Sequence, residues 1–113
     1  RKLIEKNPRP GCITFGGDGL VFWEDGAVRH LPAFHTDAVD TTAAGDIFHG
    51  AFVYSRFSGE DFRQALLFAS AAAALSTEKP GGRPSIPAVA EVRNLIRRLD
   101  AEGKLPEPRN ISR

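Results

Sequence analysis

The sequence has 113 residues, of which 42% are hydrophobic and 26% charged, with a formal net charge of +1. This length suits one domain, and the near balance of charge lacks the basic run or patch typical of proteins that bind nucleic acid or membrane surfaces. Cys12 is the single cysteine, so an internal disulfide is excluded, and no apolar run is long enough to span a bilayer. We therefore expect a cytoplasmic protein. The absence of methionine and the start at Arg1-Lys2 favour part of a longer protein.

The first third of the sequence predicts short strands. Gly11–Phe15 is an apolar, β-favouring run, and the glycine-rich residues 16–19 predict a tight turn. Leu20–Glu24 and Ala27–Leu31 flank Asp25-Gly26, which is a strong hairpin signal.

Three helices are predicted after a connecting segment. Their apolar residues recur at helical spacing, and the predicted spans are Ala44–Phe57, Asp61–Ser76 and Pro87–Gly103. Residues 80–85 carry Pro and Gly and predict a loop, whereas residues 104–113 predict a loose tail that follows a domain over 1–103. Strands followed by helices indicate part of an α/β sandwich.

The run Asp40-Thr41-Thr42-Ala43-Ala44-Gly45-Asp46 places small residues before an acid at the start of a predicted helix. First-turn backbone N–H groups lack partners within the helix and favour an anion. Taken alone, Asp46 would be an acidic helix cap. A cap needs no Gly45, which costs about 1 kcal/mol against Ala inside a helix. The run of Ala43, Ala44 and Gly45 therefore favours an anion site.

The whole run over 40–52 resembles the second signature of the ribokinase (pfkB) family of sugar kinases. The resemblance implies the C-terminal part of a ribokinase-like three-layer α/β/α sandwich, matching the last third of such proteins. It implies an ATP-dependent sugar kinase in which Ala43, Ala44, Gly45 and Asp46 form an anion hole and Asp46 is the base. The sugar-gripping residues of the family would lie upstream, so this piece alone is expected to be inactive.

The resemblance also implies a nucleotide site. Thr14-x-Gly16-x-x-Gly19 is similar to the family's segment along the nucleotide phosphates, although a simple turn would have the same pattern. The alanine block 71–74 would border the adenine, with Ser70 and Ala73 facing it. Close helix packing is the other interpretation of this block.

Cations are implied as well, with Mg²⁺ on the ATP phosphates and K⁺ between two loops. Hard cations take oxygen ligands, which both loops offer, although structural turns would explain them too. The residues expected to hold K⁺ are Asp40, Thr42, Ser76, Gly81 and Ser85.

Some choices stay open. The acceptor is a sugar or small polyol, or alternatively a nucleoside, and a homodimer is compatible with the resemblance. A non-catalytic sugar- or nucleotide-binding regulator would have no reason to retain Asp46. His49 is expected to be packed or hydrogen-bonded, and the arginines of the last helix are expected to form a solvated face: Arg93, Arg97 and Arg98.

Overall fold

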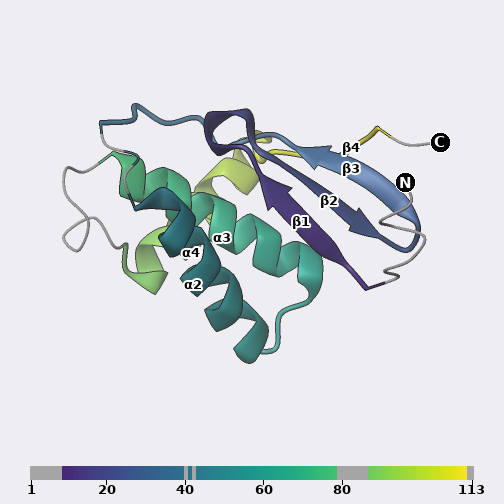
Figure 1. The fold of residues 1–113 in the computed structure, drawn as a ribbon. Helices are drawn as coiled ribbons and strands as arrows, with labels where there is room; N and C mark the ends of the chain where they lie inside the picture. Colours follow the sequence, from purple (N-terminus) through teal and green to yellow (C-terminus); the bar gives the residue numbers. More distant parts are fainter. Residues whose placement is uncertain (1–8, 40, 42, 79–86, 112–113) are drawn as a thin grey trace. The chain divides into compact units, whose positions relative to one another are not determined.

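The computed structural model describes residues 9–39, 41, 43–78 and 87–111 (Figure 1). The chain separates into two compact units. The first consists of Arg1–Ala33 and Pro106–Arg113, and the second of Phe34–Leu105. The first unit contains the strands and the second the α-helices, which is consistent with part of an α/β domain.

The first unit is an antiparallel sheet whose strand order follows the sequence (Figure 1). The strands confirm the predicted ones, except that Phe15 lies outside β1 and a fourth strand is added. Leu20, Phe22 and Leu31 are buried, so one face of β2 and the end of β3 supply buried apolar side chains in this unit. The strands are β1 (Gly11–Thr14), β2 (Leu20–Glu24), β3 (Ala27–Leu31) and β4 (Arg109–Asn110).

Local turn chemistry sets the connections between the first three strands. Asp25 and Gly26 have φ angles of 53° and 78°, the pair of positive values that a two-residue hairpin turn of type I′ requires. Between β1 and β2, Gly16–Asp18 forms a single 3₁₀ turn, η1. Gly19 follows with φ 87°, and a Cβ there would lie 2.2 Å from the Leu31 carbonyl oxygen. Only glycine fits this approach of two backbone segments.

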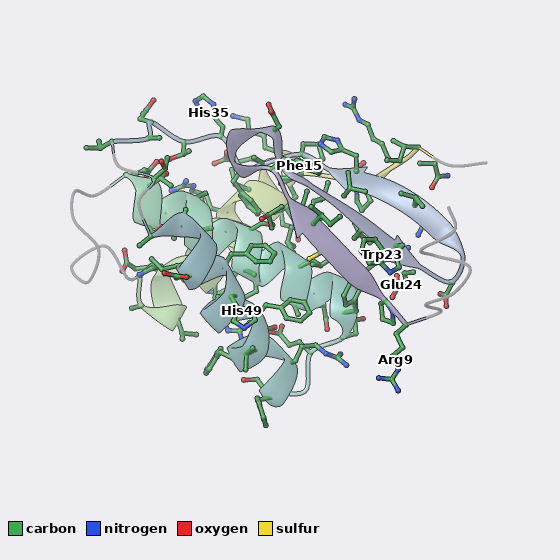
Figure 2. All side chains as sticks on the ribbon, in the orientation of Figure 1. Arg9, Phe15, Trp23, Glu24, His35 and His49 are labelled. Atoms are coloured by element: carbon green, nitrogen blue, oxygen red, sulfur yellow. The ribbon has the colours of Figure 1, made fainter. Side chains whose placement is uncertain are left out.

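The predicted loose tail is wrong for Arg109–Asn110. These residues form β4 and pair with Arg29 and His30 of β3. The Arg29 Nε atom donates to Asn110 Oδ1 at 2.8 Å, which adds a side-chain bond to the backbone pairing. At the other end of the sheet, Trp23 Nε1 donates to the Arg9 carbonyl at 3.1 Å (Figure 2).

The second unit contains three helices, α2 (Ala44–Phe57), α3 (Phe62–Thr77) and α4 (Val89–Ala101). The α2 bounds are those predicted, and Gly59 (φ 92°) follows its end. Asp61 caps α3: its carboxylate accepts from Gln64 N (2.8 Å), and Gln64 Oε1 accepts from Asp61 N (3.0 Å). α4 begins two residues later than the predicted Pro87, and the predicted loop over 80–85 lies outside the described residues.

The core of the second unit joins α3 and α4. Its buried residues are Phe34, Phe68, Ala71, Ala72 and Val92. Half of the alanine block is therefore used for close helix packing, because Ala71 and Ala72 are 0% and 2% exposed. Among the described residues, no helix has the length and apolar character needed to cross a membrane.

Candidate active site

The first turn of α2 presents backbone N–H groups ahead of the helix ladder. The first such helical bond runs from Ile47 N to the Ala43 carbonyl (3.0 Å), and Ala44 N donates to the Thr41 carbonyl (3.2 Å). The first-turn N–H groups of Gly45 and Asp46 precede that ladder. Among the described residues, no side chain makes a capping hydrogen bond at Ala43, and Asp46 lies in the first turn of α2.

Asp46 is exposed and borders a cavity of about 450 Å³ within the second unit. One wall is a continuous face of α2, the second comes from the middle of α3, and the third from the start of α4. Apart from the Asp46 carboxylate and the Tyr54 hydroxyl, the side chains lining the cavity are apolar. The lining residues are Ala43, Asp46, Ile47, Gly50, Ala51, Tyr54, Phe68, Ala72, Pro87, Val89 and Val92.

A hydrogen-bonded network connects the segment before the turn to the end of α3. Thr36 Oγ1 donates to Glu78 Oε2 at 3.0 Å and also lies 3.3 Å from Thr77 Oγ1. Val39 N donates to the Thr77 carbonyl at 2.6 Å. The backbone at Val39 is thereby fixed to the C-terminal end of α3.

The residues expected to hold K⁺ can be followed at one position only. Ser76 is 2% exposed, and its hydroxyl donates to the Ala73 carbonyl at 2.7 Å, so it serves α3 itself. Four other expected ligands lie outside the described residues: Asp40, Thr42, Gly81 and Ser85. Within the part of the chain that is described, no three His, Cys, Asp or Glu side chains gather as a metal site would require.

The expected nucleotide residues divide between the units. Thr14 and Gly16 are exposed at the end of β1, and Gly16 has φ 58° with open space around it. Gly19, in contrast, is packed against backbone. Ser70 and Ala73 are half-buried on α3.

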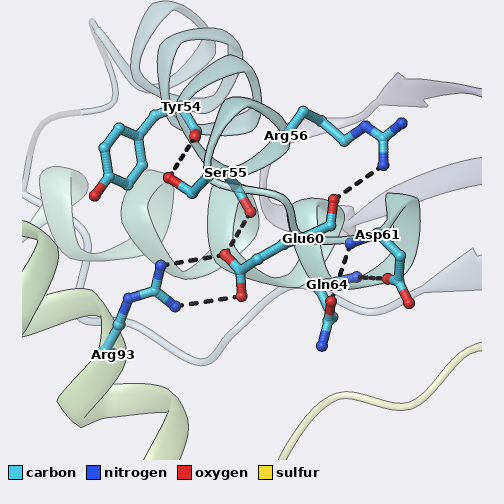
Figure 3. Close-up of polar contacts among 8 residues, drawn as sticks. Tyr54, Ser55, Arg56, Glu60, Asp61, Gln64 and Arg93 are labelled. Carbon is cyan, nitrogen blue, oxygen red and sulfur yellow. Dashed lines mark hydrogen bonds and ion pairs between the residues drawn. The ribbon is translucent and has the colours of Figure 1, made fainter.

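One polar cluster has no signal in the sequence. Glu60, in the α2–α3 connection, pairs with Arg93 of α4 (Figure 3). The expected solvated face is therefore wrong for Arg93, which is only 35% exposed, and holds for Arg97 and Arg98. His49 is exposed on α2, so the packed form of its expectation is wrong, whereas the hydrogen-bonded form stays a prediction (Figure 2).

Comparison with known proteins identifies the family. The model of the pfkB family carbohydrate kinases matches residues 1–89. The ribokinase of Haemophilus influenzae is 43% identical over 75 residues, which are 66% of this chain and 24% of that protein.

Two solved structures resemble the fold. A ribokinase crystal structure from Thermotoga maritima has a TM-score of 0.77 and 36% identity, covering 85% of this chain and 32% of that one. An Arabidopsis thaliana ribokinase, complexed with ribose and ATP, has a TM-score of 0.70 and 31% identity, covering 75% of this chain and 28% of that one. The chain thus spans about a third or less of the length of these relatives. It belongs to the pfkB family of carbohydrate kinases.

Proposed function

We propose that this chain supplies the phosphoryl-transfer part of an ATP-dependent sugar kinase. The observation that carries the proposal is the position of Asp46: an exposed carboxylate in the first turn of α2, at the rim of a cavity, beside N–H groups that precede the helix ladder. Membership of the pfkB family and the likeness to a ribokinase complexed with ribose and ATP support it.

In the proposed reaction, the Asp46 carboxylate accepts the proton of an acceptor hydroxyl while that oxygen attacks the γ-phosphorus of ATP. A new O–P bond forms, the bond from the γ-phosphorus to the β,γ-bridging oxygen breaks, and ADP leaves with that electron pair. The transferred group carries spread negative charge through a loose transition state. The N–H groups of Gly45 and Asp46 offset this charge at the positive end of the α2 dipole. Ala44 contributes shape rather than a donor, because its N–H bonds Thr41.

We also propose nucleotide contacts within each unit, taken separately. Thr14 and Gly16 would contact the phosphates, whereas Gly19 serves the turn that presents them. Ser70 and Ala73 would border the adenine. Mg²⁺ on ATP supplies further charge neutralisation in this chemistry. The Ser76 hydroxyl donates its proton to the Ala73 carbonyl, and its oxygen lone pairs would be its donors to K⁺.

The acceptor is a sugar in the proposal we favour, because the relative that supports it is a ribokinase. A nucleoside kinase of the same fold and a non-catalytic regulator are the alternatives. The exposed Asp46 favours a catalyst over a regulator, since an uncompensated acid beside a phosphate site would weaken binding of an anion.

The test follows ADP release by the protein that carries this chain, with ribose, fructose and nucleosides as acceptors. Asp46→Asn removes the base and should reduce kcat by about 10² or more, with the dissociation constant for ATP unchanged or lower. Asp100→Asn, at an exposed position of α4, is the matched control and should retain full turnover. Equal turnover in Asp46→Asn and wild type would refute the assigned base. ATP binding without turnover on any acceptor would favour the regulator.

A further inference from the structure

Glu60 is held in place by hydrogen bonds with residues at the end of α2. It lies between Gly59 and the α3 cap residue Asp61. Its N–H donates to the Ser55 carbonyl (3.2 Å), and its own carbonyl accepts from Arg56 Nη1 (2.9 Å). The Ser55 hydroxyl, which is fully buried, donates to Glu60 Oε1 at 2.7 Å (Figure 3). These bonds orient the Glu60 carboxylate toward α4.

Arg93 meets that carboxylate with both ends of its guanidinium group. Arg93 Nη2 lies 3.2 Å from Oε1, and Nη1 lies 3.3 Å from Oε2 (Figure 3). The guanidinium carbon also lies 5.0 Å from the centroid of the Phe68 ring of α3. A two-point pair fixes orientation as well as distance, and the ring contact adds a third point. Arg93 therefore ties α4 to both other helices of the unit.

Residues next to the Glu60–Arg93 ion pair contribute to the wall of the cavity that Asp46 borders. Val92, adjacent to Arg93, is 1% exposed and lines the cavity together with Val89 and Phe68. A rotation of α4 about its axis would therefore move Arg93 off Glu60 and change the cavity wall at the same time. The pair is only partly exposed, with 24% for Glu60 and 35% for Arg93, so water screens it incompletely.

We infer that Glu60 is a positioning residue, which through Arg93 holds the α4 wall of the cavity at a fixed distance from the α2 wall. Its influence on catalysis rests on the proposed function of Asp46, whereas its influence on the position of α4 does not. The alternative is that the Glu60–Arg93 pair adds stability to the fold but does not determine the position of α4. The two differ in what happens to the distance between α2 and α4 while the chain remains folded.

The experiment measures that distance by pulsed electron paramagnetic resonance, without ATP or acceptor. In the protein that carries this chain, nitroxide labels are placed at the exposed positions His49→Cys on α2 and Arg97→Cys on α4, with Cys12 and any cysteine outside these 113 residues replaced by Ser. Wild type should give one narrow distance distribution. Glu60→Gln keeps the shape of the side chain and removes its charge. It should raise about tenfold the population of a minor state with a different distance between the two labels. The swap Glu60→Arg with Arg93→Glu should restore the narrow distribution.

Two controls separate position from stability. Ile96→Val loosens the core of the same helix without touching the pair, and should lower stability while the distance stays narrow. Glu102→Gln removes the exposed pair with Lys104 (3.6 Å) and should change neither. A narrow distribution in Glu60→Gln would overturn the inference, and so would equal broadening in Ile96→Val. Because turnover is not measured, this result stands even if the proposed kinase function is wrong. Likewise, a negative result here would not contradict the kinase function.

Discussion

Two glycines of the proposed phosphate segment should respond very differently to the same substitution. A Cβ at Gly16 meets nothing within 4 Å, and φ there is 58°. The cost of Gly16→Ala is then that of a left-handed residue, about 1–2 kcal/mol, reduced by the lower entropy of the unfolded chain by about 0.4–1 kcal/mol. We expect a net loss of stability of roughly 1 kcal/mol or less.

Gly19→Ala should lower the free energy of unfolding several times more than Gly16→Ala does. Its backbone angles, φ 87° and ψ −145°, belong to a region that only glycine occupies readily, which costs about 1–3 kcal/mol for another residue. The added Cβ would also lie 2.2 Å from Leu31 O and 2.8 Å from Ala33 N. Both are backbone atoms, so relief requires moving the end of β3, at about 1–3 kcal/mol more. The expected loss is about 4 kcal/mol, a large part of the stability of a typical domain.

Urea unfolding followed by fluorescence of Trp23, the only tryptophan, measures this difference in the sheet itself. With a slope of about 1–3 kcal/mol per molar urea, Gly19→Ala should lower the midpoint by on the order of 1 M or more. Gly17→Ala, with open space and no positive φ, is the control and should be nearly neutral. Equal midpoints for Gly16→Ala and Gly19→Ala would show that the β3 backbone does not constrain the turn. Gly16 is accordingly the better position for testing ATP binding, since its substitution leaves the turn folded.

Three further predictions concern stability and reactivity. Asp61→Ala removes the cap that Asp61 and Gln64 form at α3, and thermal unfolding should show a loss of about 1 kcal/mol. The hydrogen bond from Arg93 lowers the pKa of Glu60, so the pair stabilises the fold at pH values above the unfolded-state pKa of Glu60. This stabilisation disappears as the pH falls through the lower folded-state pKa. Urea midpoints should therefore decrease in the acid range, and the decrease should be smaller in Glu60→Gln. Burial raises the pKa of the half-buried Cys12 thiol, so alkylation at mildly alkaline pH should be slower in folded than in urea-unfolded protein.

Features set by neighbouring residues could be predicted from the sequence, and features set by distant residues could not. Asp25-Gly26 specifies the hairpin because the turn conformation depends on those two residues alone. The end of α2 follows in the same way from Gly59. The β4 strand has only two residues and pairs with a strand far back in the sequence, so no local pattern marks it. Arg93 resembles its exposed neighbours until Glu60, 33 residues earlier, is placed beside it.

The same distinction applies to the candidate site. Composition and order alone mark the turn before α2, because an anion site at a helix start needs small residues and exposed backbone. The cavity beside it depends on three helices that approach one another through residues far apart in sequence, and no motif predicts its lining. Sequence therefore predicts where the proposed chemistry lies, and packing determines the space around it.

The two ends of α2 have different tasks, and the helix connects them rigidly. Ser55 follows Asp46 by nine residues, or about two and a half turns, so the two side chains lie on opposite faces. Ser55 is fully buried and bonded to Glu60, whereas Asp46 is exposed beside the cavity. Anchoring Ser55 restrains the rotation of the helix about its axis and thereby the side of α2 from which Asp46 projects. Burial at one end of α2 therefore sets which side of the helix presents the exposed acid at the other end.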